Sequence, residues 1–374
     1  MAVGFESRFV DGGQGRLHVL ARDGMRAPGP VLCLVHGNLS SARFFEPLVA
    51  GMPRSWRVLA PDLRGFGRSG PAPVDATRGV GDFADDIAAV LADPDLVRPH
   101  RRVHLAGWSL GGDAVMRYAI DHPERVASVT LIAPGSPFGF GGTKDDTGTL
   151  CYPDAAGSGA GLIAAELLQR LKDGDDTGES PLSPRSVLRS HYLWPGLRLP
   201  ATLEDQLVGE ILATALGDAS YPGDQQASAN WPGVAPGTHG VANALSPLYC
   251  DVSGFAEVAA RWPVLWVRGA DDLIVSDHSP ADTGELGATG ALPGWPGPEF
   301  PAQPMVAQTR AMLRRAEAAG GRFTEHVIPR CGHSPHLERP EELRELLAEF
   351  VTAAESHPRG AAGISPAGPR RREN

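Results

Sequence analysis

A serine between two glycines is the residue of this chain best suited to act as a nucleophile. The stretch Gly107-Trp108-Ser109-Leu110-Gly111 follows a short apolar run and precedes a helical pattern. A sharp strand-to-helix turn holds such a serine in a strained backbone conformation, which lifts its hydroxyl clear of the sheet. Glycines are required beside it because side chains would collide with neighbouring backbone. The pattern therefore predicts nucleophilic catalysis by Ser109, and the structural alternative is an ordinary Gly/Ser turn between a strand and a helix.

A serine is a weak nucleophile at neutral pH, so it needs a base and a carboxylate that orients this base. His333 follows the last predicted strand and a turn glycine, which favours it as the base. His336 is the alternative, but it precedes a leucine and is expected to pack or to cap a helix. Three aspartates, Asp271, Asp272 and Asp277, follow the predicted strand that ends at Gly269, and one of them is expected to supply the carboxylate.

Acyl transfer also needs backbone N–H groups that stabilise the negative charge of the tetrahedral intermediate. One is predicted to be the N–H of Leu110, directly after the serine. The other is predicted to come from Asn38, in a turn over residues 36–39 that follows a buried strand. The structural alternative for this turn is a helix entry capped by Asn38. His36 itself is expected to be structural.

Strands and helices alternate on both sides of a central break, which predicts an α/β fold with a mostly parallel sheet covered on both faces. Several strands are continuous apolar runs, as expected for strands buried on both faces. The predicted strands cover residues 15–21, 30–35, 57–60, 103–108, 126–133, 263–269 and 323–328. The predicted helices of this part include residues 83–91, 303–319 and 340–354, and another helix starts after Ser40 or Ser41.

The break spans residues 136–251, which are rich in Gly, Pro, Asp and Ser and show helical stretches but no strands. The helical stretches lie near residues 162–171, 184–192 and 203–216. An insertion of this kind predicts a helical cap over the sheet edge where ligands bind in open α/β sheets. The expected domains are a core of residues 1–135 and 252–355, the cap over 136–251, and a disordered tail over 356–374. A Pro/Gly-rich loop over 279–304 is long enough to suggest a functional flap.

Composition excludes several other classes of protein. The 374 residues carry 44 acidic and 34 basic side chains without a basic stripe, so nucleic acid is not an expected partner. No apolar run reaches the roughly 18 residues that span a bilayer, and no secretory signal is evident. The four cysteines lack metal-site spacing, which favours reduced thiols in a cytoplasm and neither metal nor cofactor. Cys151 and Cys250, near the two ends of the inserted segment, are the one conceivable disulfide. A homo-oligomer is possible.

Five motifs together resemble the α/β-hydrolase superfamily. They are H-G-N at 36–38, D-L-R-G-F-G-R-S at 62–69, G-W-S-L-G-G at 107–112, G-A-D-D at 269–272 and G-H-S-P-H at 332–336. They are similar to its capped branch, which holds bacterial esterases, cofactor-free haloperoxidases, C–C bond hydrolases and epoxide hydrolases. The resemblance implies a doubly wound α/β-hydrolase sheet and a Ser109–Asp272–His333 triad in that chain order. The acid of such families usually stands three residues after the strand-ending glycine, which selects Asp272.

The same resemblance limits the reactions that are expected of this chain. H-G-N also resembles haloalkane dehalogenases, but their nucleophile is an aspartate, so Ser109 argues against dehalogenation and epoxide opening. The 62–69 motif is carried over as a structural turn. The expected substrate is a small-to-medium, largely apolar carboxylic ester or lactone, cleaved through an acyl-serine intermediate. Alternatives with the same triad are C–C bond hydrolysis and amide or peptide cleavage, and a non-catalytic ligand-binding protein is the alternative of another class.

Aromatic residues near the expected site are the candidates for an apolar substrate pocket. Their alternative role is to hold the cap against the core. The candidates are Trp108, Phe138, Phe140, Tyr192, Trp194 and Trp231.

Overall fold

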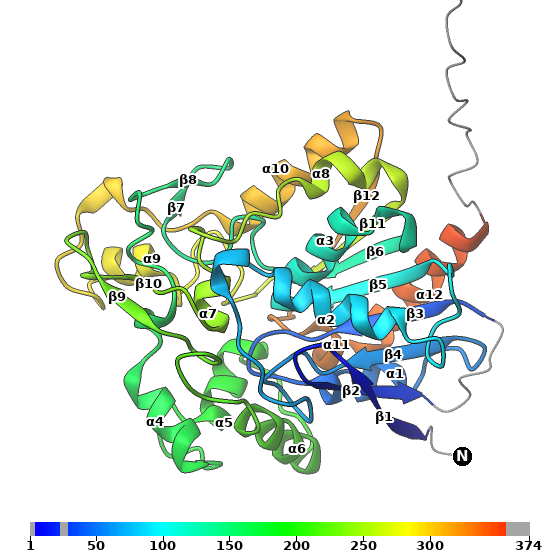
Figure 1. Ribbon diagram of the computed structural model, residues 1–374. Helices are drawn as coiled ribbons and strands as arrows, with labels where there is room; N and C mark the ends of the chain where they lie inside the picture. Colours follow the sequence, from blue (N-terminus) through cyan, green and yellow to red (C-terminus); the bar gives the residue numbers. More distant parts are fainter. Residues whose placement is uncertain (1–3, 23–28, 357–374) are drawn as a thin grey trace, which may run out of the picture.

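An eight-stranded sheet forms the centre of the protein, shown by a computed structural model that describes residues 4–22 and 29–356 (Figure 1). The strand order is β1-β2-β4-β3-β5-β6-β11-β12. β2 runs antiparallel to both β1 and β4, and all other neighbouring strands are parallel. The predicted α/β class with a mostly parallel sheet is confirmed. The strands are β1 (Phe5–Asp11), β2 (Arg16–Arg22), β3 (Val31–Val35), β4 (Arg57–Pro61), β5 (Val103–Trp108), β6 (Val126–Ile132), β11 (Pro263–Gly269) and β12 (Arg322–Ile328).

Helices cover both faces of this sheet, and every residue of β3, β4 and β5 is consequently buried (Figure 1). None of the helices in the described part of the chain is both long and apolar enough to cross a membrane. One layer consists of α2 (Gly81–Ala92), α3 (Leu110–Asp121), α8 (Phe255–Val258) and α10 (Met305–Ala318), and the other of α1 (Glu46–Val49), α11 (Pro335–Glu338) and α12 (Pro340–Ser356).

The edge strand β1 was not predicted, because most of its side chains are exposed or half-buried and only Val10 is fully buried. A strand of this kind carries no apolar alternation that could mark it in the sequence. At the other end of the chain, α12 extends to Ser356. The tail predicted over 356–374 otherwise lies outside the described residues.

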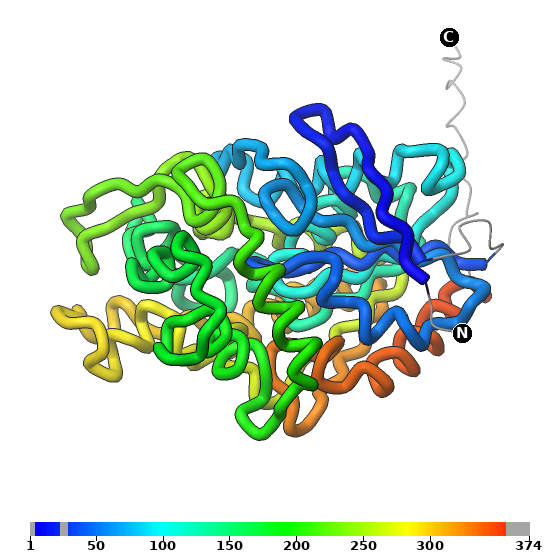
Figure 2. Tube along the Cα trace, turned by 90° about the horizontal axis from the view of Figure 1, so that it is seen from below, coloured from blue at the N-terminus to red at the C-terminus, as the bar shows by residue number. Residues whose placement is uncertain are grey.

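Residues 136–251, between β6 and α8, gather at one end of the sheet, and both views show them there (Figures 1 and 2). The helices of this inserted segment lie close to the predicted stretches, but the expectation that it lacks strands was wrong. Each of its strands is only two or three residues long, too short to show a period of two in the sequence. Its elements are β7 (Thr143–Lys144), β8 (Thr149–Leu150), α4 (Ala165–Asp173), α5 (Pro184–Val187), a π-helical turn (Leu188–Tyr192), α6 (Ala201–Leu212), β9 (Gln225–Ala227), β10 (Val234–Pro236) and α7 (Val241–Ala244).

The 279–304 loop is more ordered than its composition indicates. It contains the helix α9 (Thr283–Ala288), whose N-terminus is capped by the Asp282 carboxylate. Near its end, the Trp295 indole N–H donates to the Phe300 carbonyl at 2.8 Å, and Phe300 is fully buried. The loop is therefore packed against the rest of the molecule. Its role as a flap stays a prediction.

All four cysteines are free, so the disulfide considered between Cys151 and Cys250 is not formed. Burial raises the pKa of Cys33 to about 12 and that of Cys151 to about 11. Burial also raises the pKa of Cys250 and Cys331. Thiols that stay protonated at neutral pH are poor nucleophiles, and Cys33, Cys250 and Cys331 are part of the hydrophobic core.

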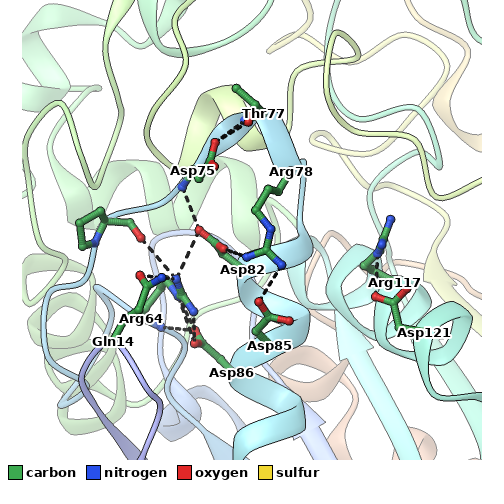
Figure 3. A network of polar contacts seen from close by, with 11 residues as sticks. Gln14, Arg64, Asp75, Thr77, Arg78, Asp82, Asp85, Asp86, Arg117 and Asp121 are labelled. Atoms are coloured by element: carbon green, nitrogen blue, oxygen red, sulfur yellow. Dashed lines mark hydrogen bonds and ion pairs between the residues drawn. The ribbon is translucent and has the colours of Figure 1, made fainter.

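A buried ion network holds the 62–69 turn against α2. Figure 3 shows the Arg64 guanidinium between two carboxylates, 2.7 Å from Asp86 and 3.3 Å from Asp82. All three side chains are no more than 3% exposed. Asp82 also accepts the backbone N–H of Asp75 at 2.8 Å. The stretch that follows binds the inserted segment, since the Ala76 N–H donates to the Thr238 carbonyl at 3.0 Å.

Removing the shared cation should be costly. In Arg64→Met, Asp86 is left buried without a counter-charge and Asp82 keeps only its ion pair with Arg78, so the free energy of unfolding should fall by about 3–5 kcal/mol. Urea denaturation measures this difference. The matched control is Arg117→Met, whose pair with Asp121 also appears in Figure 3 but is 40% and 35% exposed. It should change the same quantity by less than about 1 kcal/mol. Equal losses in both variants would contradict the role assigned to burial.

The contribution of Asp282 to the free energy of unfolding should fall as the pH rises. One carboxylate oxygen accepts the N–H of Gly284 at 2.9 Å, the other has no partner among the described residues, and burial raises the pKa of Asp282 to about 6. The folded chain thus keeps a proton that the unfolded chain releases near pH 4. Relative to Asp282→Asn, the wild-type free energy of unfolding should drop by about 2–3 kcal/mol between pH 4 and pH 7.

The control for this experiment is Asp75→Asn, which alters an exposed carboxylate that also caps a helical turn. The bond from the Thr77 hydroxyl lowers the pKa of Asp75, so its contribution should grow, not shrink, as the pH rises from 3 to 5. Urea unfolding at four pH values measures both differences. Parallel curves for wild type and Asp282→Asn would contradict the prediction.

Candidate active site

Ser109 lies at a strained turn between β5 and α3. Its backbone angles are φ 54° and ψ −126°, a conformation that costs energy for any residue with a side chain. A Cβ on Gly107 would lie 2.2 Å from the Gly111 carbonyl oxygen, and a Cβ on Gly111 would lie 2.2 Å from that of Val35. The two glycines are therefore required by close backbone packing. The turn leaves the Ser109 side chain only half-buried, although β5 is fully buried.

The structure brings His333 and Asp272 together from two loops at the ends of neighbouring strands. Nδ1 of His333 lies 2.9 Å from Oδ2 of Asp272, and both side chains are buried. The other Asp272 oxygen accepts the N–H groups of Ile274 and Val275 at 2.8 and 2.9 Å. Because a carboxylate only accepts, the proton of a neutral imidazole must sit on Nδ1, which leaves Nε2 able to accept one. Asp271, in contrast, is exposed.

Trp108 packs against His333 and binds its backbone. Its indole N–H donates to the His333 carbonyl at 2.8 Å, and the two rings lie 5.5 Å apart. Trp108 is fully buried, in a stack that includes Phe44 at 5.7 Å. Since Ser109 is the next residue in the chain, this bond ties the histidine loop to the serine turn. The buried position favours this supporting role for Trp108 over direct contact with a substrate.

His336, the alternative base, is a packing residue in this structure. It lies in α11 with its ring 4.4 Å from Trp108 and 4.9 Å from Phe45. It is fully buried, and neither ring nitrogen has a partner among the described residues. Burial holds the pKa of His336 well below its usual value, so the ring stays neutral.

Glu338 holds the histidine loop and was missed by the sequence analysis. Its buried carboxylate accepts the backbone N–H groups of Gly332 and Ser334 at 3.0 Å and that of Trp194 at 2.7 Å. The first two flank His333, and the third belongs to the inserted segment. Burial raises the pKa of Glu338, and these three N–H groups oppose the shift. An acidic residue five positions after the histidine is the signal that marks it in the sequence.

The turn over residues 36–40 is held by buried side chains of the core. His36 Nε2 accepts the Leu63 N–H at 3.0 Å, so its proton sits on Nδ1, which donates to the Gly37 carbonyl at 2.7 Å. The Ser40 hydroxyl donates to the same carbonyl at 2.7 Å. Burial lowers the pKa of His36, which keeps the ring neutral. Because a peptide unit is planar, fixing the Gly37 carbonyl also fixes the direction of the Asn38 N–H.

This turn packs directly on the serine. A Cβ on Gly37 would lie 2.9 Å from the Ser109 Cβ, so only glycine fits there. Leu110, which directly follows Ser109 in the chain, is the first residue of α3. Backbone N–H groups at the start of a helix have no partner within the helix. The turn with Asn38 and the helix start with Leu110, which carry the two predicted oxyanion donors, thus both adjoin Ser109.

The other aromatic candidates take part in packing. The Phe138 ring lies against Gly148, where a Cβ would come within 2.2 Å of it, and Phe140 is half-buried. Trp231 packs edge-on against Phe300 with the ring centroids 5.0 Å apart. The side chain of Trp194 is half-buried. These contacts agree with the alternative of aromatic side chains that hold segments together, and a role in lining a pocket stays a prediction.

Asp113 is a second buried group that the sequence analysis missed. It lies four residues after Ser109 in α3, is fully buried, and has no partner for either carboxylate oxygen among the described residues. Burial raises the pKa of Asp113 well above its usual value and thereby favours the protonated form. As for metal ligands, no cluster of three or more His, Cys, Asp or Glu side chains suited to a metal ion occurs in residues 4–22 and 29–356.

Comparisons with known proteins identify the family. A family model described as the α/β hydrolase fold matches residues 30–156. The chain is 36% identical over 212 residues to a Variovorax paradoxus protein named "Putative carbamate hydrolase RutD". The matched region covers 52% of this chain and 77% of that protein. It is 32% identical over 134 residues to carboxylesterase YbfK of Bacillus subtilis, covering 36% of this chain and 43% of YbfK.

Solved structures share the fold over nearly the whole chain. Esterase RhEst1 of a Rhodococcus species has a TM-score of 0.54 at 18% identity, over 95% of this chain and all of RhEst1. Carboxylesterase CesB of Bacillus subtilis also has a TM-score of 0.54, at 17% identity, over 94% of this chain and 92% of CesB. The chain belongs to the α/β-hydrolase family and is a hydrolase.

The two adjacent aspartates should differ sharply in their effect on turnover. Asp272→Asn removes the acceptor that keeps the His333 proton on Nδ1, so kcat for p-nitrophenyl butyrate should fall on the order of 10⁴-fold. Asp271→Asn is the matched control and should stay within about twofold of wild type, because Asp271 is exposed. A severe loss in Asp271→Asn with a nearly silent Asp272→Asn would contradict the assignment.

Proposed function

We propose that this chain is a serine hydrolase that cleaves a small-to-medium, largely apolar carboxylic ester or lactone. The observation that carries the proposal is the buried 2.9 Å contact between His333 and Asp272, beside the strained turn of Ser109. A buried, oriented imidazole beside a half-buried serine is the arrangement that acyl transfer requires. The names of the relatives, carboxylesterase and carbamate hydrolase, support hydrolysis at an acyl carbon.

In the proposed mechanism, His333 Nε2 takes the Ser109 hydroxyl proton while Oγ attacks the substrate carbonyl carbon. The N–H groups of Asn38 and Leu110 stabilise the oxyanion, each worth roughly 10²–10³ in rate. His333 then passes its proton to the leaving alcohol, which yields the acyl-serine. A water molecule deprotonated by the same imidazole hydrolyses this ester and restores Ser109. Asp272 stabilises the imidazolium and stays ionised throughout.

Residues 136–251 are proposed to act as the cap of this site. The support is that the Trp194 backbone N–H bonds to Glu338 next to the histidine loop, and that Tyr192 packs 6.1 Å from the His333 ring. The half-buried residues Phe140 and Trp194 are proposed to form part of the apolar wall of the substrate pocket, together with Phe138 and Trp231. The proposed partners are small-molecule substrates. A cytoplasmic location is proposed because the cysteines are free.

Carbamate hydrolysis is the second candidate. The specific support is the relative named as a carbamate hydrolase, of which this chain spans 77% at 36% identity. The same triad serves this reaction, because a carbamate also presents a carbonyl carbon to the serine and releases an alcohol or an amine. The nature of the leaving group, rather than the triad, then separates the two candidates.

A substrate panel tests both candidates. We expect the highest kcat/KM among p-nitrophenyl esters of short-to-medium acyl chains or lactones, with slower turnover of matched p-nitrophenyl carbamates. Ser109→Ala should lower kcat for each substrate by several orders of magnitude, because no nucleophile remains. A fluorophosphonate probe should label wild type and fail to label Ser109→Ala.

The control is Ser190→Ala, which removes an exposed hydroxyl of the inserted segment and should leave labelling and turnover unchanged. Folded wild-type protein without labelling would instead support a non-catalytic ligand-binding protein. Turnover confined to amides or to diketones would replace the ester proposal by one of the other reactions of the same triad.

A further inference from the structure

Two tyrosines of the inserted segment converge on one residue of the core, Asn38. The Tyr192 hydroxyl donates to the Asn38 backbone carbonyl at 3.0 Å. The Tyr221 hydroxyl forms a hydrogen bond with the Asn38 side-chain amide. Both tyrosines are buried, at 7% and 2% exposure, and burial raises the pKa of both phenols above the ordinary range. Tyr192 therefore keeps its proton at neutral pH and remains a donor to this carbonyl.

The turn that these tyrosines hold is strained. Leu39 has φ 45°, in the left-handed region that is strained for an L-residue. Its N–H donates to the Asn38 side-chain oxygen at 3.0 Å, so the Asn38 side chain is itself part of the turn. A strained turn persists only where its surroundings hold it.

The two peptide units of this turn are fixed from opposite sides. Core residues His36 and Ser40 bind the Gly37 carbonyl, which belongs to the peptide unit carrying the Asn38 N–H. The next peptide unit begins with the Asn38 carbonyl, which is bound by Tyr192. The core alone therefore restrains only one side of Asn38. The second restraint comes from the inserted segment, which lies about 150 residues further along the chain.

We propose that Tyr192 and Tyr221 are positioning residues, which fix Asn38 in the geometry needed to stabilise the oxyanion. This inference rests on the proposed function, because it gives the Asn38 N–H the role of an oxyanion donor. It adds that the catalytic turn is complete only when the inserted segment is docked. Neither hydroxyl is assigned a contact with substrate. Their action runs through the Asn38 carbonyl and side chain.

Kinetics of Tyr192→Phe and Tyr221→Phe test the proposal. Each variant keeps the aromatic ring and loses one hydroxyl, so Asn38 gains freedom while packing is retained. We expect kcat for the best ester to fall about 10-fold and KM to stay within about twofold, because only transition-state stabilisation is lost. A trifluoromethyl ketone, which forms an oxyanion on Ser109, should bind about 10-fold more weakly. The pH profile should not move, because His333 and Asp272 are unchanged.

The matched control is Tyr118→Phe. Tyr118 is equally buried, at 2% exposure, but packs against His122 near the end of α3, away from the serine turn. Its kcat and inhibitor affinity should equal those of wild type. A rise in KM alone in the Tyr192 and Tyr221 variants, or an unchanged trifluoromethyl ketone affinity, would overturn the positioning role.

Hydrogen exchange separates failure of this inference from failure of the proposed function. In Tyr192→Phe, the backbone amides of residues 37–40 should exchange at least about fivefold faster than in wild type or Tyr118→Phe, because loss of one hydrogen bond weakens the turn. This measurement requires no turnover. Unchanged protection would overturn the inference even in an active esterase. Faster exchange without any effect on kcat in an active enzyme would overturn the link to oxyanion stabilisation.

Discussion

The strained backbone of Ser109 is the constraint on which the rest of the structure depends. The conformation persists because β5 lies between two parallel neighbours, β3 and β6, and because glycines allow backbone to approach from both sides. Gly37 brings a second loop against the serine, where any larger residue would collide with its Cβ. The stability of the buried sheet, whose central strands expose no side chain, offsets the free-energy cost of this strain.

Around this turn, loops are positioned by buried polar groups that bind backbone rather than by contacts between side chains alone. Asp272 accepts two N–H groups besides contacting His333, Glu338 accepts N–H groups on both sides of that histidine, and His36 orients the Gly37 peptide unit. A buried polar group that is fully bonded rigidifies its surroundings, because any movement leaves it unsatisfied at high cost. The predicted site residues thus lie on loops whose backbone is held by buried hydrogen bonds.

The inserted segment takes part in this rigidity. Glu338 reaches its backbone at Trp194, and its tyrosines at 192 and 221 reach Asn38. The Arg64 network joins the same segment to α2 through the stretch around Ala76. Contacts at the His333 loop, at the Asn38 turn and beside α2 mean that displacement of the segment would disturb the loops of His333 and Asn38 together.

The sequence alone determined the α/β class, the mostly parallel sheet and the positions of Ser109, His333 and the candidate aspartates. These follow from local signals, namely buried apolar runs, turn glycines and the order of motifs along the chain. The family resemblance favoured Asp272 over Asp271, but only the tertiary structure placed Asp272 against His333, buried Trp108, and brought Glu338 and Tyr221 to the loops of His333 and Asn38. Adjacent aspartates have the same local pattern, and a tyrosine in a Pro/Gly-rich segment carries no periodic signal. What distinguishes them is contact between residues far apart in the chain, which the packing of the folded protein decides.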